Sequence, residues 1–370
     1  MITWEQRKLE DICSYQSSSL TINDIDETGQ YDLYDANSLI GKTNKGYMKM
    51  EYITIIKDGA GVGRTRMLPK NSMFLGTMGA LTPKNSYLGF LYQLVTNANL
   101  GKICTGSTIP HIYFKDYGKL KFCIPSIIEQ EVIGKFFNNI DYLITLHQRK
   151  LDNLKLKKKA LLQKLFPKNG ERYPELRFPG FTDAWEQRKL GDIATITGGG
   201  TPSTNISEYW NGDIDWYSPV EIGEKRYAIG SIRKITKLGL EKSSAKILPV
   251  GTVLFTSRAG IGNTAILQVE GCTNQGFQSI TPNSKELDTY FLYTMTPKLK
   301  RYGEVTGAGS TFVEVSGKQM ERMNLMIPSL DEQKHVSQLF KVMDDAITLH
   351  QRKLDHLQLQ KKALLQQMFV

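Results

Sequence analysis

The sequence predicts an α/β (α+β) protein with an internal pseudo-two-fold repeat, in which two globular mixed α/β domains are joined by two long helices that form an antiparallel coiled coil. Three observations predict this fold. A chain of 370 residues is long enough to build two domains with separate cores. The chain also repeats itself. Each copy of the repeat ends in a heptad pattern that is typical of a long, paired helix.

The repeat consists of conserved frames around divergent inserts. WEQRKLEDI at residues 4–12 returns as WEQRKLGDI at 185–193, and residues 124–166 return at 327–369 with ITLHQRKLD and KKALLQ unchanged. The inserts agree only in short patches, such as AGVGRT at 60–65 against AGIGNT at 259–264, and GST at 106–108 against 309–311. We predict a domain over 1–123, a long helix over 124–168, a second domain over 169–326 and a second long helix over 327–370.

Divergence between two inserts of one fold has two explanations. Neutral drift after gene duplication is one. The other is that the divergence is the function, because two related domains with different surfaces can recognise two different things. The close match between the frames favours the second explanation.

The long helices have marked beginnings. Pro125 and Pro328 stand where a helix start tolerates a missing N–H donor. Ser126 with Glu129, and in the second copy Ser329 with Glu332, match the capping-box spacing in which a hydroxyl and a carboxylate satisfy free backbone N–H groups. The predicted seams that pair with each other are Ile140, Ile144, His147, Leu151, Leu154, Lys158, Leu161 and Leu165 in one helix and Met343, Ile347, His350, Leu354, Leu357, Lys361, Leu364 and Met368 in the other.

Polar residues interrupt both seams. His147 and Lys158, with their counterparts His350 and Lys361, suggest either a metal or catalytic site or a device that fixes register; we favour register, since a polar group on a seam penalises misaligned pairing. A helix of such length spans about 60 Å. An antiparallel pair could therefore hold two DNA-facing domains one or more turns of the duplex apart, each turn being about 34 Å.

Composition favours a nucleic-acid partner. The formal net charge is +10 and the pI about 9.2. Part of this excess is a run of lysines at 155–159, which is either a DNA-facing or a solvated helix face. No apolar run is long enough for a membrane span, and the first residues lack the layout of a secretory signal, so we expect a cytoplasmic protein without membrane contact.

Catalytic signatures are absent from the sequence. The chain has no Pro-Pro, which excludes the motif of an amino-methyltransferase, and Gly41-Lys42-Thr43 lacks the earlier glycine of a phosphate-binding loop. The clusters Gly59, Gly61, Gly63 and 198–200 do not have dinucleotide-binding spacing, and we interpret both as tight turns. We interpret the four dispersed cysteines, Cys13, Cys104, Cys123 and Cys272, as small core residues. No metal or acid-base cluster can be assembled from the five histidines.

The inserts carry the candidate DNA-binding residues. Runs such as YITII at 52–56 and GTVLFTS at 251–257 predict strands between Gly-rich turns, and recognition is expected on the loops. The candidates for phosphate or base contacts are Lys42, Lys45, Lys49, Arg64 and Arg66 in the first insert and Arg226, Arg258, Asn263, Asn274 and Gln275 in the second. Solvation at the surface is the alternative for each. We expect Tyr209, Trp210, Trp216 and Tyr217 to be core residues and not stacking platforms.

Together with the duplication, four motifs resemble the specificity subunits of type I restriction-modification enzymes along the whole chain. They are FPGFTDAWEQRKLGDI at 178–193, GGGTPST at 198–204, AGIGNT, and the IPSxxEQ helix entry at 124–130 and 327–333. The first insert departs from this pattern, since it is shorter and has YQSSS at 15–19 in place of a GGxP-like opening. That departure indicates a different subtype of domain.

The resemblance implies two target-recognition domains that each read one half of a bipartite site on double-stranded DNA, without catalysis or a cofactor in this chain. It also implies two modification subunits, which bring S-adenosylmethionine and methylate adenine, and restriction subunits that use ATP and Mg to translocate and cleave DNA.

Two other functions stay open. One is a free-standing DNA-binding protein such as a regulator. The helix surfaces favour an assembly instead, because a partner present in two copies would explain identical residues at equivalent positions, namely Gln148, Arg149 and Lys150 and Gln351, Arg352 and Lys353. The other, a methyltransferase or nuclease in its own right, would need catalytic residues that the sequence does not contain.

Overall fold

The computed structural model describes residues 4–59, 61–106, 110–168, 170–258, 260–307 and 314–369. The chain forms two compact units: unit 1 comprises Met1–Lys150 with His350–Val370, and unit 2 comprises Leu151–Leu349. This division runs through both long helices, whereas the boundaries predicted from the sequence keep each helix whole. Those boundaries remain a prediction.

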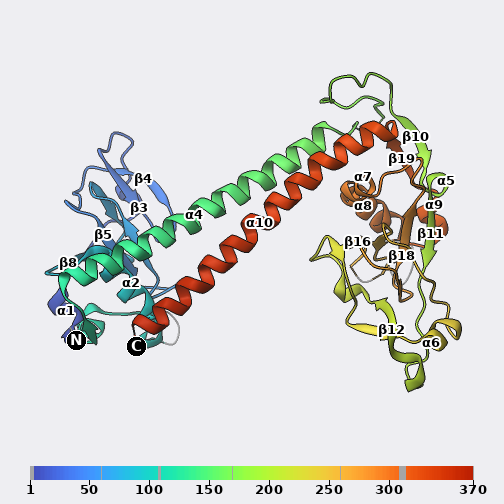
Figure 1. Cartoon of the computed structure of the whole chain (residues 1–370). Coiled ribbons are helices and arrows are strands. Elements are labelled where there is room, and N and C mark those ends of the chain that lie inside the picture. Colours follow the sequence, from blue (N-terminus) through green and yellow to red (C-terminus); the bar gives the residue numbers. More distant parts are fainter. Residues whose placement is uncertain are drawn as a thin grey trace. The chain divides into compact units, whose positions relative to one another are not determined.

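Unit 1 is a mixed α/β unit (Figure 1). Its strands are β1 Glu5–Lys8, β2 Cys13–Ser17, β3 Tyr31–Tyr34, β4 Leu39–Thr43, β5 Tyr52–Ile56, β6 Thr65–Leu68, β7 Ser72–Phe74, β8 Met78–Pro83 and β9 Lys121–Ile124. Its short helices are α1 Leu9–Ile12, α2 Leu88–Asn97 and α3 Phe114–Tyr117, and the long helix α4 Ile127–Lys164 begins here.

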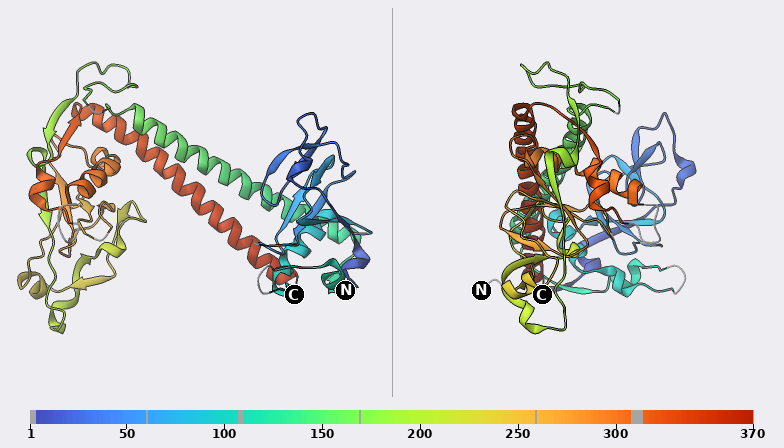
Figure 2. Two further views of the ribbon diagram at one scale, coloured as in Figure 1. Left: turned by 180° about the vertical axis from the view of Figure 1, so that it is seen from behind. Right: turned by 90° about the vertical axis from the view of Figure 1, so that its right-hand side faces the viewer.

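Unit 2 repeats this order with additions (Figure 2). Its strands are β10 Glu186–Lys189, β11 Ala194–Gly198, β12 Trp210–Tyr217, β13 Tyr227–Ala228, β14 Arg233–Ile235, β15 Val253–Phe255, β16 Thr264–Leu267, β17 Gly271–Thr273, β18 Gln278–Pro282 and β19 Asn324–Ile327. Its helices are α5 Leu190–Ile193, α6 Lys237–Glu241, α7 Thr289–Thr294, α8 Thr296–Gly307 and α9 Gly317–Glu321, followed by the long helix α10 Leu330–Met368.

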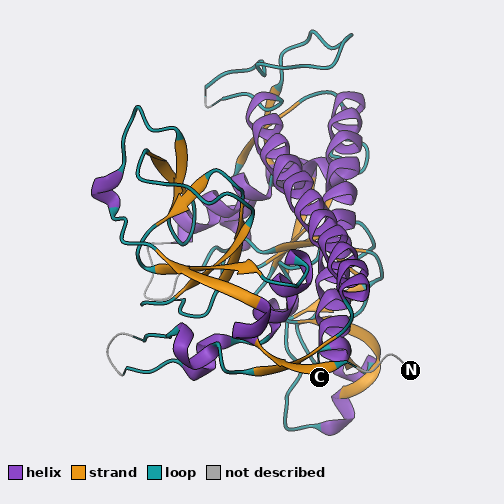
Figure 3. Ribbon diagram, turned by 90° about the vertical axis from the view of Figure 1, so that its left-hand side faces the viewer, coloured by secondary structure: helices purple, strands orange, loops and turns teal. Residues whose placement is uncertain are grey.

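The strands, drawn in orange in Figure 3, form matching sheets in the two units. A three-stranded sheet has a central strand with one antiparallel and one parallel neighbour, in the order β4-β3-β7 in unit 1 and β14-β12-β17 in unit 2. The larger sheet is β2-β8-β5-β6 in unit 1 and β11-β18-β15-β16-β13 in unit 2. The inserts therefore share a fold, and β13 adds an edge strand to the second. The predicted strand YITII coincides with β5, which is buried along its whole length.

The conserved frames close each unit. The WEQRK segment forms β1 and β10, which pair antiparallel with β9 and β19, the strands that lead into the long helices. The core of unit 1 takes in Leu365 of α10, and that of unit 2 takes in Leu165 and Phe166 at the end of α4. Full burial of one such side chain contributes about 1.5–3 kcal/mol. Each domain core is therefore completed by the helix that belongs to the other copy of the repeat.

The predicted seams are confirmed. Every seam residue of α4 and α10 is buried or half-buried. In unit 1 the Nδ1 atoms of His147 and His350 lie 2.8 Å apart, and Lys361 Nζ donates to Asp141 Oδ1 at 2.6 Å. These two contacts run in opposite residue order, so the helices are antiparallel there. In unit 2 the equivalent lysine, Lys158, donates to Asp344 Oδ1 at 2.5 Å.

The capping prediction is half right. Ser126 Oγ accepts the Glu129 N–H at 3.3 Å, and Ser329 Oγ accepts the Glu332 N–H at 3.4 Å, so the hydroxyls cap the helices. The carboxylates do not return to the backbone. Instead, Glu129 accepts the indole N–H of Trp4 at 3.2 Å, and Glu332 lies 3.4 Å from the indole nitrogen of Trp185. Pro125 lies just before the cap and not inside the helix.

Two further expectations need correction. Cys13 and Cys272 are buried, but Cys104 and Cys123 are exposed, so only half of the cysteines are core residues. The 198–200 cluster is not a tight turn. A Cβ at Gly199 would lie 2.0 Å from the Asn274 carbonyl oxygen, so these glycines permit close approach of two backbone segments.

The aromatic residues of the second insert confirm the core interpretation. Trp210, Trp216 and Tyr217 are buried, and the partly buried Tyr209 packs against the cluster that contains Trp210 and Trp216. No helix in the described part of the chain is long and apolar enough to cross a membrane.

Candidate nucleic-acid interface

A glycine-rich turn in unit 1 positions Arg64. Gly61 and Gly63 have φ angles of 88° and 82°, which other residues rarely adopt. A Cβ on Gly63 would lie 2.2 Å from the Gly101 nitrogen, so the turn packs directly on the segment after α2. Arg64 follows at the start of β6, exposed, and its Nη2 donates to the Ala36 carbonyl at 2.8 Å and to Asn37 Oδ1 at 2.6 Å.

Arg66 lies two residues further along the chain, in β6, and so points to the same side as Arg64. The two arginines form one basic edge, called the arginine edge. The Arg66 guanidinium stacks on the Tyr34 ring at 5.2 Å. Nη1 of Arg66 is buried without a hydrogen-bond partner among the described residues.

The three candidate lysines of unit 1 lie at the other end of β4. Lys42, Lys45 and Lys49 are all exposed. Lys45 forms an ion pair with Asp24 at 2.5 Å, and hydrogen bonding to this lysine is the main cause of a lowered Asp24 pKa, about 2. The structure therefore separates the lysines from the arginine edge formed by Arg64 and Arg66.

The equivalent turn in unit 2 is held by a threonine. Gly260 and Gly262 both have a φ of 90°. Thr256 Oγ1 donates to the Gly260 carbonyl at 2.7 Å and accepts the Asn263 N–H at 2.9 Å, so it closes the turn. The Asn263 side chain lies half-buried against Gly223, where a Cβ would come within 2.9 Å of it.

A second loop lies beside this turn. Ser257 N–H donates to the Gly276 carbonyl at 2.8 Å, which connects the Arg258 segment to the 274–276 loop. Gln275 is exposed and accepts the Thr201 hydroxyl at 2.5 Å, and Asn274 Oδ1 accepts the Gly276 N–H at 2.8 Å. Arg258 forms an ion pair with Glu314 at 2.9 Å. The structure thus brings Arg258, Asn274 and Gln275 together at one end of the sheet.

Arg226 lies elsewhere in unit 2. Its guanidinium forms an ion pair with Asp345 of α10, donates to the Tyr290 hydroxyl at 2.8 Å and stacks on Tyr227 at 4.7 Å. Burial opposes the charged form, but the hydrogen bonds that Arg226 donates to Tyr290 and Asp345 outweigh it and raise the pKa of Arg226. Its contacts join the insert to the long helix.

Sequence reasoning missed two further residues of unit 2. Thr201 belongs to the GGGTPST motif but was not predicted as a DNA-binding residue, although its hydroxyl beside Gln275 can contact a base or a phosphate. Arg233 lies over the Trp210 ring at 3.7 Å, and its exposed guanidinium is available to an anion. Pairing of β12 with β14 creates this contact, so no local sequence signal could have found it.

The predicted docking residues lie in unit 1 on both helices. Gln148, Arg149, Lys150, Arg352 and Lys353 are exposed and Gln351 is half-buried. Gln351 donates to Asp355 one turn further along α10 at 2.9 Å.

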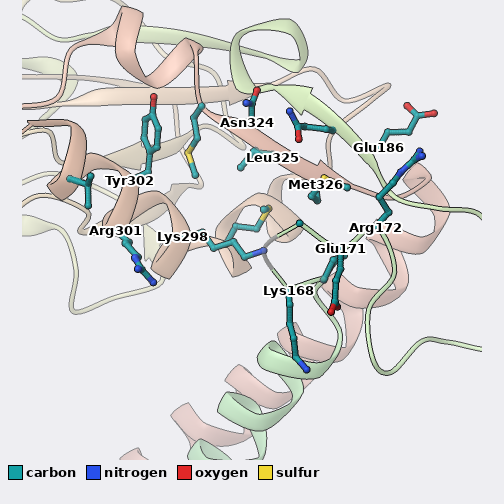
Figure 4. Close-up of a pocket in the computed structure, with 16 residues that line it drawn as sticks. Lys168, Glu171, Arg172, Glu186, Lys298, Arg301, Tyr302, Asn324, Leu325 and Met326 are labelled. Carbon is teal, nitrogen blue, oxygen red and sulfur yellow. The ribbon is translucent and has the colours of Figure 1, made fainter.

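A pocket of about 1070 Å³ opens in unit 2 beside the connector between α4 and β10 (Figure 4). Lys168 and Arg172 come from the connector, and Lys298, Arg301 and Tyr302 come from α8. Its lining residues include no histidine or cysteine. Among the described residues no group of three or more histidine, cysteine or acidic side chains could hold a metal ion.

The sequence is similar to known proteins along both halves of the chain. Residues 1–156 and 182–359 match the family described as type I restriction modification DNA specificity domain. The chain is 37% identical over 166 residues to the type I restriction enzyme MjaIX specificity subunit of Methanocaldococcus jannaschii, covering 44% of this chain and 38% of that protein. It is 22% identical over 351 residues to the MjaVIII specificity subunit of the same organism, covering 89% of this chain and 81% of that protein.

The fold has a counterpart among solved structures. The S subunit of a type I restriction-modification system from M. genitalium superposes with a TM-score of 0.67 at 17% identity, covering all of this chain and 96% of that one. At this identity the likeness concerns the fold. The matched segment spans only about two-fifths of the MjaIX subunit's length. Because the sequence match covers most of both halves of the chain, this protein belongs to the family of type I restriction modification DNA specificity domains.

Proposed function

We propose that this chain reads a bipartite DNA sequence as the non-catalytic specificity subunit of a type I restriction-modification complex. The observation that carries the proposal is the pair of inserts with one topology and different surfaces, held in nearly identical frames. In the position of the same turn, one insert has Arg64 and the other has Asn263. Arginine pairs with guanine edges and asparagine with adenine edges, so equivalent positions are equipped to read different bases.

The proposed base-reading residues are those that the fold gathers on loops and, in unit 1, on the turn before β6 and the first residues of that strand. In unit 2 they are Arg258, Asn274 and Gln275, with Asn263 on the adjoining turn. In unit 1 they are Arg64 and Arg66. The exposed Lys42, Lys45 and Lys49 lie apart from the arginine edge, and we assign them to phosphate contacts, which position a protein on DNA without reading it. We leave Arg226 out of the proposed surface, because its side chain is only 16% exposed and Asp345 and Tyr290 already hold its guanidinium.

The proposed partners follow from the family. Two modification subunits would supply S-adenosylmethionine and adenine methylation, and restriction subunits would supply ATP-dependent translocation and cleavage with Mg. The identical Gln-Arg-Lys segments at 148–150 and 351–353 support two equivalent docking surfaces for the modification subunits. The complex would act in the cytoplasm, where its DNA substrate is present.

The decisive experiment is single-molecule sequencing of adenine methylation in a methylation-free host. The chain is expressed with a matching modification subunit, and each protein is expressed alone as a control. Methylation of one split motif only in the co-expression is the expected result. Methylation by this chain alone would contradict a non-catalytic role, and a stable complex without methylation would favour the free-standing DNA-binding protein.

Variants of the two inserts sharpen this experiment. Gln275→Ala is expected to relax or abolish recognition of one half of the motif and leave the other half unchanged. Arg64→Ala is expected to act on the opposite half. If both variants alter the same half, the assignment of one half-site to each domain is wrong.

A further inference from the structure

Three loops of unit 2 meet at one edge of the three-stranded sheet. β12 and β17 run parallel, with Tyr217 opposite Thr273, so the loops that follow these strands lie at the same end of the sheet. The Asn274 N–H donates to the Tyr217 carbonyl at 3.0 Å, which joins the two loops. β14 runs antiparallel to β12, so the loop before β14 reaches the same edge. This edge carries Asn274 and Gln275, which the proposed function assigns to base reading.

The loop after β12 is rigidly held. Glu221 Oε1 accepts both the N–H and the hydroxyl of Ser218, at 2.9 Å and 2.8 Å. Glu221 Oε2 accepts the Ile232 N–H at 2.7 Å, from the loop before β14. A Cβ on Gly276 would lie 3.0 Å from Pro219 Cγ, so the proline ring packs directly on the loop after β17. One carboxylate and one proline ring therefore hold the three loops in a fixed arrangement.

Two apolar side chains on this edge are exposed to solvent. Val220, between Pro219 and Glu221, is 89% exposed, and Ile232 is 83% exposed. We call these two residues the apolar pair. Both are β-branched, so they have few rotamers to lose when a ligand binds. The residues gathered near them, Asn274 and Gln275, are polar, so the apolar pair lies within a surface that otherwise suits hydrogen bonding.

We propose that the apolar pair contacts thymine methyl groups in the half-site that unit 2 reads, and so selects thymine there. The inference rests on the proposed function. In the major groove thymine presents its C5-methyl group, next to the hydrogen-bonding atoms of its own and neighbouring base pairs. Apolar side chains beside Asn274 and Gln275 match this mixture of groups. Because the loops are already held by Glu221, little conformational entropy is lost on contact.

DNA is the occupant that the position of the apolar pair favours. The contacts of Glu221 and Pro219 make the pair part of the same rigid edge as Asn274 and Gln275. A partner protein bound over Val220 and Ile232 would cover these amides and keep them from the bases. A thymine methyl group buries the apolar side chains while the amides pair with base edges.

The test uses the complex with the modification subunit and the motif that methylation sequencing identifies. The unit 2 half-site is the half that Gln275→Ala alters. Each of its thymines, on either strand, is replaced in turn by deoxyuridine, which removes only the methyl group. The parent complex is expected to bind at least one such duplex roughly three- to tenfold more weakly, because a methyl group leaves an apolar contact. A Val220→Ser, Ile232→Ser double variant is expected to bind thymine and deoxyuridine duplexes alike.

The matched control is an Ile247→Ser, Val250→Ser double variant. It changes one isoleucine and one valine that are also exposed and belong to the same unit. Their segment lies at the other end of the sheet, because Leu248 pairs with Gly271 at the start of β17. The control is expected to keep the full sensitivity to deoxyuridine that the parent complex shows.

Two results would overturn the inference and leave the proposed function standing. One is a motif that the parent complex methylates and binds equally well with thymine or deoxyuridine at every position, or a sensitivity that V220S, I232S retains. The other is a double variant that no longer assembles with the modification subunit, because the apolar pair would then contact protein. Failure of the proposed function is seen separately, as the absence of a methylated split motif with the parent complex, and the inference fails with it.

Discussion

Two glutamines at equivalent positions of the repeat, Gln130 and Gln333, explain part of the IPSxxEQ motif. The Gln130 side-chain amide donates to the Pro125 carbonyl at 2.9 Å and accepts the Tyr87 N–H at 3.1 Å. Gln333 makes the same pair of contacts, with Pro328 at 3.0 Å and Asp288 at 2.9 Å. Both glutamines are buried, so each satisfies backbone groups that water cannot reach. The motif therefore ties the start of each long helix to the helix packed beside it.

The neighbouring glutamates give a residue-scale prediction. Glu332→Gln removes the charge that Arg177 faces in a largely buried pair, so we expect unit 2 to lose about 3 kcal/mol or more of its free energy of unfolding. Glu129→Gln is the matched control in unit 1, where the carboxylate is partly exposed and pairs with no arginine among the described residues, and should cost about 1 kcal/mol or less. Urea unfolding followed by tryptophan fluorescence checks both. Equal losses in the two variants would contradict this assignment.

The histidine pair on the seam gives a pH dependence. Partial desolvation, with the charges of His350, Lys353 and Lys150, lowers the pKa of His147 below its ordinary value. The unfolded chain then takes up a proton near pH 6.5 that the folded state resists, so stability falls as the pH drops through this range. We expect the urea midpoint to fall between pH 7.5 and pH 5 more in the parent chain than in a His147→Leu, His350→Leu double variant. Identical pH profiles would exclude this role for the pair.

At the scale of elements, the two long helices are held by equivalent ion pairs with different surroundings. Asp344 also accepts the Tyr290 hydroxyl at 2.9 Å, and its side chain is 13% exposed. Asp141 also accepts the Gln93 amide at 3.0 Å, and its side chain is 34% exposed. The polar seam residues therefore have specific partners, which supports the interpretation that they fix register.

This difference in exposure predicts that removing the two lysines lowers the free energy of unfolding by unequal amounts. Lys158→Met leaves the more buried carboxylate without its cation and should cost about 2 kcal/mol. Lys361→Met leaves Asp141 without its cation, but this carboxylate is already more exposed to water. The variant should therefore lose less than about 1 kcal/mol of its free energy of unfolding. Urea titration of both variants tests the order. A larger loss in K361M would show that burial of the carboxylate does not determine the cost.

At the scale of the whole molecule, the proposed function assigns the net charge of +10 to DNA affinity and the inserts to sequence recognition. The lysines of unit 1 are exposed and lie apart from the arginine edge. In the proposed function they contribute electrostatic affinity that is independent of sequence.

Neutralising lysines should therefore weaken binding to all sequences alike. A Lys42→Gln, Lys49→Gln double variant is expected to lower affinity for target and non-target DNA by the same factor and to reduce the salt slope by roughly 2. Lys119→Gln, Lys121→Gln removes the same charge from the frame around β9 and is the control. Affinity is measured over a range of salt concentrations. A loss restricted to target DNA would assign Lys42 and Lys49 to base reading.

The sequence was informative wherever a periodic pattern decides the structure. The heptads predicted the paired helices and every seam residue, because apolar residues with that period form a stripe on one helix face, which is buried when a second helix packs against it. The repeat predicted two units with one topology. The candidate site was predicted only as residue types on loops. Arg64 and Gln275 lie where loops gather, but Arg226 was indistinguishable from them in sequence, and Asp345 lies 119 residues away from it along the chain.

What the sequence by itself determined is the internal repeat, the fold class, the two long helices and the family resemblance, since these depend on patterns local to each segment or repeated between segments. The tertiary structure alone decided which polar groups meet. It turned Glu129 and Glu332 from capping residues into hydrogen-bond partners of the Trp4 and Trp185 indoles, and it paired Lys158 and Lys361 with aspartates of the opposite helix. Pairing of this kind depends on distance in space between residues far apart in the chain, which neither propensity nor periodicity encodes.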